Sequence, residues 1–401
     1  MSRPRMLVFG MVALLSFLLS TSASATLFSS EGHGWWWDGS DAAAIGRGGT
    51  SVAVLGYGVT GATNPAVIAG TDLSYGHISY GAEVWNVKGD EGTFRQRADL
   101  LPQFGGVIVL PYGLRVGGVL RVQTDASYER ERVVEEGDGY TVRTSGKGGW
   151  NRLQLLAAGS LMGRHVIWGL GLARVQGSVR EDWTYDFEGS GTRDVRQVIE
   201  GRLKGGWITS AGLLLGPLDR LALAFVGSTG GSSRFVQETE NLAGGTFASS
   251  LSGRQELPPE LAFGVRVGPI RHMTLSAERS QTSWGDAGLR ISSDAPLTHP
   301  YDDASRLGIG LEYSKGAGDD FARTYRIGFQ DVASYLRDAE GSEIGERALT
   351  LGFREPMGKR RAAFDLALEF GKRGDIAQLG IEETFLRITV GVIFSSTIRE
   401  Y

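Results

Sequence analysis

The sequence contains no cysteine among its 401 residues. Neither a disulfide framework nor a thiolate metal site can therefore form. The stability of the fold must come from packing and from backbone hydrogen bonds.

The chain also lacks, beyond residue 25, any apolar run approaching the roughly 20 residues of a membrane-spanning helix. Its one apolar run, Leu7 to Leu19, follows two arginines and precedes the small residues Ser22 to Ala25. This order predicts a secretory signal peptide over residues 1–25, cleaved after Ala25. The alternative is an uncleaved anchor helix, for which the apolar run is short.

The net charge of the chain is small. The formal net charge is −4, and loss of the two arginines of the signal changes it to −4 − 2 = −6. A mildly acidic chain offers no electrostatic basis for binding nucleic acid.

Motifs for catalysis are missing as well. The five histidines (33, 77, 165, 272 and 299) fall in separate predicted elements, and no serine lies in a G-x-S-x-G turn. The glycine-rich stretch 46–49 neither follows a buried strand nor opens a β-α-β unit, so it is not a phosphate loop. We therefore expect no enzyme, no bound metal and no cofactor.

The chain does have glycine, 60 residues or about twice the average share, and apolar residues at alternate positions. In the clearest case Phe364, Leu366, Leu368 and Phe370 fall on one face of a strand, with charged Asp365 and Glu369 on the other. The same alternation recurs over 114–123, 261–267, 306–313, 325–330 and 386–394. An apolar face opposite a face of charges and glycine is typical of a membrane barrel, although a soluble β-sandwich also alternates.

The lengths and order of the segments favour the barrel. Gly201–Leu215 and Leu114–Tyr128 exceed the five or six residues of soluble strands. Short connections near 112, 163, 217, 269, 317 and 358 alternate with polar stretches at about 86–102, 129–149, 182–200, 229–257, 282–303, 331–346 and 371–383. Outer-membrane barrels alternate short periplasmic turns with long outer loops. The sequence thus predicts an all-β transmembrane antiparallel β-barrel of about 14 strands in a bacterial outer membrane.

Residues 26–70 do not follow the strand pattern. They are rich in glycine, alanine and tryptophan, and the apolar residues among them argue against disorder. A barrel of this size is too wide for wall side chains to fill alone. We expect residues 26–70 to form a hatch, or plug, inside the lumen of a barrel formed by residues 71–401. The alternative is a periplasmic tail.

A resemblance to a known family rests on these N-terminal residues. Asp41 to Val54, with its A-x-x-x-G-x-G-G pattern, is followed by Asn64-Pro65-Ala66. This stretch resembles the hatch of the long-chain fatty acid transporter (FadL) family, and Leu101–Gly106 and Phe385–Gly391 resemble segments of the same superfamily, which includes PorV-type barrels. The hatch motif would comprise Gly46, Gly48, Gly49, Asn64, Pro65 and Ala66.

The resemblance implies a 14-stranded barrel with an N-terminal hatch and passive diffusion of hydrophobic compounds. It also implies sideways exit near a kinked third strand. The expected partners are a hydrophobic small-molecule ligand, outer-membrane lipid and, during biogenesis, the barrel-assembly machinery. Regular alternation ends at Phe394, seven residues before the terminal Tyr401.

Three groups of residues are candidate sites. A ligand pocket is predicted at Leu27, Phe28, Trp35, Trp36 and Trp37, unless these residues only anchor the hatch or mark the membrane interface. A lateral gate is predicted at Gly117 and Gly118, where glycine weakens strand pairing. Lumen charges that pair with one another are predicted at Arg115, Arg121, Lys204, Arg266, Glu278, Glu312, Arg326, Asp365, Glu369 and Arg387.

Two functions fit these features. The first is passive transport of hydrophobic small molecules, such as fatty-acid-like or aromatic compounds, through a hatch-plugged barrel. The second is a PorV-like barrel that holds or delivers exported proteins. An apolar pocket beside the tryptophans would favour the first, and a protein-sized surface of long outer segments would favour the second.

Overall fold

The computed structural model of the protein describes residues 26–30, 33–36, 41–56, 63–89, 92–134, 140–162, 165–187, 195–216, 220–241, 247–290, 301–315, 322–337, 341–357 and 361–396. The predicted signal peptide (residues 1–25) and Trp37 lie outside these residues. Among the described residues, no helix is both long enough and apolar enough to cross a membrane.

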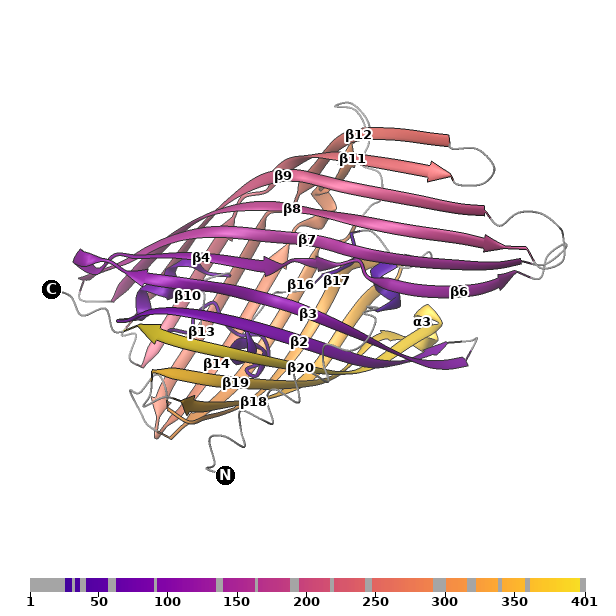
Figure 1. Ribbon diagram of the computed structural model, residues 1–401. Coiled ribbons are helices and arrows are strands. Elements are labelled where there is room, and N and C mark those ends of the chain that lie inside the picture. Colours follow the sequence, from indigo (N-terminus) through magenta and orange to yellow (C-terminus); the bar gives the residue numbers. More distant parts are fainter. Residues whose placement is uncertain are drawn as a thin grey trace, which may run out of the picture.

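A closed antiparallel β-barrel forms most of the described structure (Figure 1). Its first half contains β2 (Ser74–Gly89), β3 (Gly92–Val109), β4 (Arg115–Val122), β6 (Tyr128–Val134), β7 (Tyr140–Leu161), β8 (Val166–Asp186), β9 (Val195–Leu215), β10 (Leu221–Ser228) and β11 (Gly231–Asn241). The second half contains β12 (Phe247–Leu257), β13 (Glu260–Ile270), β14 (Met273–Thr282), β15 (Gly288–Arg290), β16 (Ala304–Ser314), β17 (Thr324–Arg337), β18 (Glu343–Met357), β19 (Ala362–Asp375) and β20 (Ile381–Ser396).

These 18 strands occupy 14 positions in the wall, because four positions are each shared by two successive strands. The shared positions are β4 with β6, β10 with β11, β12 with β13, and β14 with β15. Strand β20 pairs with β2 along its whole length and closes the barrel. The predicted antiparallel barrel of about 14 strands is thereby confirmed.

Alternation along each strand separates an outer face from an inner face. In β16 the side chains of Leu307, Ile309 and Leu311 are 38–44% exposed, whereas Arg306 is 9% exposed and lies inside. A wall that presents its apolar side chains outward and its charges inward is suited to surrounding lipid.

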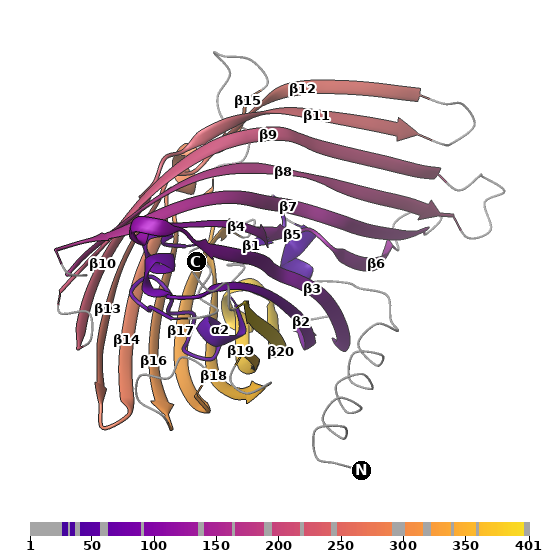
Figure 2. The same ribbon diagram turned by 60° about the vertical axis from the view of Figure 1, so that its left-hand side comes forward.

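Some predicted loops were wrong. The stretch 229–257 contains the hairpin of β11 and β12, and β7, β8 and β9 continue far into the predicted loops at 129–149 and 182–200. These three strands have 22, 21 and 21 residues, about twice the length that crosses a bilayer. Figure 2 shows that they project together with β11 and β12 beyond the rest of the barrel. Polar residues beyond the membrane need not alternate with apolar ones, so periodicity does not reveal such strands.

The N-terminal segment enters the barrel and packs against the inner wall (Figure 2). It contains the 3₁₀-helix η1 (Leu27–Ser30), the short strand β1 (Trp35–Trp36), the helix α2 (Ala42–Ile45) and the 3₁₀-helix η2 (Pro65–Gly70). The remaining short elements are β5 (Thr124–Asp125), η3 (Pro111–Gly113), η5 (Trp284–Asp286) and α3 (Ile376–Leu379).

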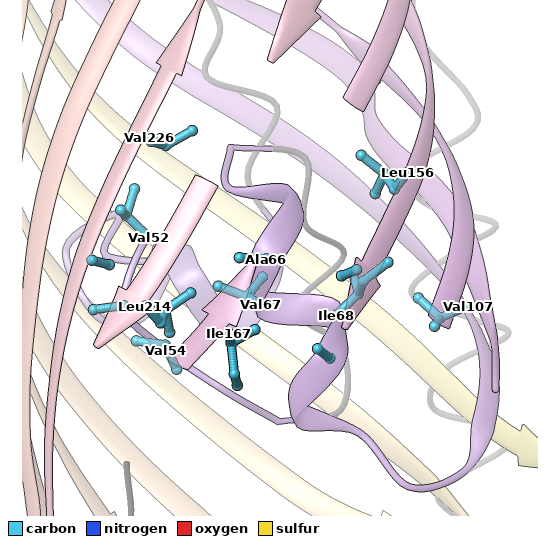
Figure 3. Close-up of a cluster of buried hydrophobic side chains, with 14 of the residues drawn as sticks. Val52, Val54, Ala66, Val67, Ile68, Val107, Leu156, Ile167, Leu214 and Val226 are labelled. Atoms are coloured by element: carbon cyan, nitrogen blue, oxygen red, sulfur yellow. The ribbon is translucent and has the colours of Figure 1, made fainter. Parts of the chain in front are cut away.

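An apolar core joins the N-terminal segment to the wall (Figure 3). Val52, Val67 and Ile68 are at most 1% exposed and pack in one cluster with Ile167 of β8 and Leu214 of β9. Removing such side chains from water is the main favourable contribution to packing. These residues of the segment therefore pack inside the barrel wall.

Candidate functional site

The glycines of the N-terminal motif allow its backbone to touch the backbone of the wall. Gly48 has φ +67°, and a Cβ placed on it would lie 2.4 Å from the carbonyl oxygen of Phe329 and 2.6 Å from that of Ile309. On the wall side, a Cβ on Gly308 would lie 2.3 Å from the carbonyl oxygen of Gly48. Only glycine permits this approach together with a positive φ. Gly46 and Gly49 also face the wall, near Gly352 and the Arg306 side chain.

Asn64-Pro65-Ala66 forms a second anchor. The Asn64 side chain accepts a hydrogen bond from the Ala66 amide (3.0 Å) and donates one to the Val52 carbonyl (2.8 Å). It thereby caps η2 and connects the two halves of the segment. A Cβ on Gly212 of β9 would lie 1.8 Å from the Asn64 side chain, and one on Gly169 of β8 would lie 2.2 Å from the Ala66 nitrogen.

Glu278 of β14 holds the segment between these anchors. Its carboxylate accepts hydrogen bonds from the backbone amides of Ser51 (2.6 Å) and Val52 (2.7 Å) and pairs with Arg306 of β16. Arg306 in turn donates to the carbonyl of Gly49 (3.0 Å). The buried Glu278 carboxylate of the wall thus finds hydrogen-bond donors in the N-terminal segment. The backbone groups of Gly49, Ser51 and Val52 in turn find partners on the wall.

A larger ionic network lies on the inner faces of β2 and β18–β20. Arg373 pairs with Glu83 (3.1 Å), Glu346 (2.7 Å) and Glu383 (2.9 Å). Arg387 pairs with Glu83 and with Glu369 (3.1 Å). All of these side chains are at most 7% exposed. Two guanidinium groups therefore hold four carboxylates in the barrel interior.

A neighbouring network lies nearer the short turns. Asp365 accepts hydrogen bonds from Arg326 (2.9 Å) and Arg354 (2.7 and 2.9 Å). Glu312 bridges Arg326 (2.7 Å) and Arg47 of the N-terminal segment (3.1 Å). The predicted lumen charges of this region thus lie close together and pair with one another.

Aromatic side chains collect beyond the ionic network. Trp284, which is fully buried, stacks on Tyr335 with ring centroids 4.4 Å apart and meets Trp36 edge-on at 5.6 Å. The Tyr335 hydroxyl donates to the carbonyl of Gly34 (2.6 Å) and accepts from the amide of His33 (3.1 Å). The cluster therefore combines apolar surface with the fixed polar contacts that aromatic groups need when buried.

A cavity of about 110 Å³ lies beside these rings. Trp35 and Trp36 line it together with Arg121 of β4, Arg152 of β7 and Glu260 of β13. The Arg152 guanidinium pairs with Glu260 (3.1 Å). The inner residues Glu346, Glu369, Arg387, Ser280, Thr282 and Gln330 also contribute to its lining. Aromatic rings thus meet a few converging charged groups, as is typical of small-molecule sites.

The ladder of the wall is interrupted next to this cavity. Strand β3 pairs with β4 only over Gln103–Val109, and among the described residues its outer half pairs with β2 alone. Strand β6, which resumes the position of β4, pairs with β7 and, within the described part of the chain, with no second strand. Between them β5 pairs with β1, so that Trp35 faces Asp125 and Trp36 faces Thr124. The β7 side stays connected, since the amides of Gln123 and Ala126 donate to the carbonyls of Trp150 (2.7 Å) and Gly148 (2.9 Å).

A second cavity, of about 600 Å³, opens on the outer face at the same interruption. Thr124 and Asp125 line it along with the exposed side chains of Gln176, Ser178 and Lys204. The two cavities share no lining residue. The short ribbon of β1 and β5 therefore lies between the lumen cavity and the outer cavity.

Gly117 and Gly118 do not interrupt the wall. Both are paired on each side, with β3 and with β7, and the interruption lies further along, on the β3 side of residues 123–127. Gly148 and Gly149 of β7 accompany it, with φ of +110° and +145°. The sequence signal for this site is the Gly148-Gly149 pair rather than the glycines within β4.

Two predicted lumen charges are placed differently. Lys204 is exposed on the outer face, because Gly205, with φ +99°, and a register shift against Val175–Gly177 reverse the alternation of β9. Arg266 is half-buried, on β13. Arg115 lies near the short turns, where it donates to the carbonyl of Thr71 (3.0 Å). Of the predicted pocket residues, Phe28 is buried beside Trp35, and the side chain of Leu27 lies outside the described part of the chain.

Several interior residues had no sequence signal. Trp150 belongs to β7 and Trp284 to η5, far apart in the chain, and Trp284 falls in a stretch that we expected to be a polar loop. Arg373 lies beyond Phe370, the last apolar residue of β19, and Glu346 and Glu383 lie near the ends of β18 and β20, next to polar neighbours. The period-2 pattern does not extend to them.

Comparison with known proteins adds relatives in fold. The BamG family model matches residues 229–397, less than half of the chain. No curated protein sequence matches this chain. Among solved structures the Pseudomonas putida toluene transporter TodX aligns with a TM-score of 0.61 at 17% identity, covering 91% of this chain and 99% of that one.

Two further structures agree. A FadL homologue from Pseudomonas aeruginosa aligns with a TM-score of 0.60 at 12% identity, covering 90% of this chain and 98% of its own. The Ralstonia pickettii toluene transporter TbuX aligns with a TM-score of 0.56 at 17% identity, with coverages of 90% and 98%. The protein therefore shares its fold with the FadL-like hydrocarbon channels, as its N-terminal motif predicted.

Proposed function

We propose that the protein is a passive outer-membrane channel for hydrophobic small molecules, in which residues 26–70 act as the hatch. The observation that carries the proposal is the position of the cavity beside Trp35 and Trp36, directly inside the interruption of the wall. Solved structures with this fold include proteins described as toluene transporters.

In this proposal a ligand rests against the tryptophan rings and leaves sideways when the ribbon of β1 and β5 separates. The ribbon is short. Among the described residues, β1 contributes Trp35 and Trp36 to the pairing, and β5 contributes Thr124 and Asp125. Sideways exit would deliver an apolar molecule directly to lipid. The molecule would not pass through water, where exposure of apolar surface is unfavourable.

Binding and transport of defined probes test the proposal. We expect purified protein in detergent to bind toluene and dodecanoate, and Trp36→Ala to weaken binding about tenfold, corresponding to about 1.4 kcal/mol. The matched control is Trp207→Ala, since Trp207 is 57% exposed on the outer face. Equal binding by the native protein and the Trp36 variant, or no uptake of either probe into proteoliposomes, would refute the proposal.

The second candidate is a PorV-like barrel that contacts exported proteins. The observation in its favour is the set of long strands β7, β8, β9, β11 and β12, which project beyond the barrel and offer a broad outer surface (Figure 1). Crosslinking in cells separates the two candidates. A photo-reactive residue placed at the exposed position of Arg180 on β8 should capture a protein partner only if the second candidate function is correct.

A further inference from the structure

A row of positive side chains crosses the outer face of the projecting strands. Arg234 of β11 is directly opposite Arg254 of β12, and Arg254 is directly opposite Arg290 of β15. Lys204 of β9 follows Leu203, the partner of Phe235, and so lies beside Arg234. Four neighbouring strands therefore each place a cation at the same level.

Three of these side chains face outward, and Arg290 is half-buried. Lys204, Arg234 and Arg254 are exposed, and the Arg254 side chain is 66% accessible. The residues next to them along the strands, Leu203, Ser233 and Gln255, are buried inside.

The members of the row differ in their acidic partners. Arg254 pairs with Glu256 (3.0 Å), two residues along the same strand. Within the part of the chain that the structure describes, neither Lys204 nor Arg234 lies within ion-pair distance of a carboxylate. Elsewhere on the same strands the outward arginines are paired, as Arg202 is with Glu200 (2.7 Å) and Arg196 with Asp182 (2.7 Å). Lys204 and Arg234 therefore differ from the paired arginines of their surroundings.

Like charges directly opposite each other destabilise a pair of strands. An isolated lysine or arginine on an exposed strand is an ordinary protection against aggregation. Consecutive cross-strand arginines exceed what that protection needs. Their mutual repulsion would be relieved by an anionic ligand that bridges several of them.

The position of the row relative to the apolar band of the wall indicates which ligand it would meet. The exposed apolar band of the wall ends nearby at Trp207, three residues after Lys204 in β9. The Arg174 guanidinium lies 5.8 Å from the centroid of the Trp207 ring. Trp and Arg at this position are typical of the boundary between hydrocarbon and headgroups. The cations thus stand where lipid phosphates of the outer leaflet would meet the wall.

We propose that Lys204, Arg234, Arg254 and Arg290 form a binding site for the phosphate groups of an outer-leaflet glycolipid. Guanidinium groups bind phosphate oxygens through paired, charge-assisted hydrogen bonds, and the acyl chains of the lipid lie along the apolar band below. This site is on the outer wall and separate from the lumen cavity.

Native mass spectrometry of the full-length protein in detergent tests the proposal. The probe is lipid A, a glucosamine disaccharide lipid with two phosphates, compared with the same lipid after enzymatic removal of the phosphates. We expect the native protein to retain the bisphosphorylated lipid, and Arg234→Gln/Arg254→Gln to bind it about tenfold more weakly. The matched control Arg143→Gln/Arg347→Gln removes the same charge from exposed arginines elsewhere, and should bind the lipid as the native protein does.

Other outcomes overturn the site. Equal retention by both double variants, or equal retention of the dephosphorylated lipid, would show that the row does not recognise lipid phosphate. Displacement of the lipid by millimolar inorganic phosphate would assign the row to free phosphate instead. In lipid-free detergent the Arg234/Arg254 variant should unfold no earlier than the native protein. Earlier unfolding would reveal a structural role and contradict the proposal.

Discussion

The guanidinium of Arg373 lies over the ring of Trp35, 4.4 Å from its centroid. Arg373 belongs to β19 and Trp35 to the N-terminal segment, so this one contact joins the ionic network of the wall to the aromatic lining of the lumen cavity. Two features that are separate in the sequence thus form one site.

Replacing Arg373 by methionine should destabilise the barrel strongly. Glu83, Glu346 and Glu383 would each lose a buried cationic partner, and breaking such a network costs about 3–5 kcal/mol. The unfolding midpoint in urea, read by the heat-dependent mobility of the barrel on an SDS gel, measures the change. Arg347→Met, at an exposed pair with Asp331, should change stability by less than about 1 kcal/mol.

Glu278→Gln should loosen the N-terminal segment. The carboxylate receives two backbone amides of that segment and also balances Arg306, so its loss leaves Arg306 without its buried counter-charge. We expect a loss of about 3 kcal/mol and faster swelling of proteoliposomes in small sugars. Asp331→Asn is the control, and unchanged swelling with unchanged stability would contradict the anchoring role.

Gly48→Ala and Gly118→Ala form a matched pair. A methyl group on Gly48 would overlap the carbonyls of two wall strands at a positive φ, whereas one on Gly118 meets no atom within 4 Å. The first should cost about 1–3 kcal/mol and the second should be close to neutral. Thermal unfolding of both variants measures the two changes in stability. Equal effects would mean that the close approach of segment and wall is not formed.

Deletion of residues 26–70 tests the hatch. If the segment obstructs the lumen, the truncated protein should still resist SDS at room temperature and should admit small polar solutes into liposomes faster than the full-length protein. Liposome swelling with arabinose measures the difference. An unchanged rate from a correctly folded truncated barrel would rule out a hatch role for these residues.

A disulfide across β1 and β5 tests the proposed exit. Because the chain has no cysteine, Trp36→Cys/Thr124→Cys introduces a single pair at directly opposed positions, within the reach of a disulfide. Oxidised protein should transport toluene several-fold more slowly than the same protein after reduction. Thr141→Cys/Asp186→Cys, which joins β7 to β8, is the control and should transport equally in both states. Redox-independent transport by the first variant would exclude exit at this point.

The sequence determined the barrel, because lipid on one side and a polar lumen on the other impose a period of two that can be read directly in segments such as 364–370. It also determined the number of strands through the order of its turns. The alternation did not predict the face of every charge. Lys204 faces outward because a single glycine, Gly205, shifts the register of β9.

Only the tertiary structure decided which residues meet in the lumen. Trp35, Trp284 and Arg373 come from parts of the chain that closure of the barrel brings together, and no local pattern records such distant contacts. The same holds for the interruption of the wall. Glycine is common in every strand, so composition pointed to Gly117 and Gly118, whereas the pairing of β5 with β1 placed the break at residues 123–127.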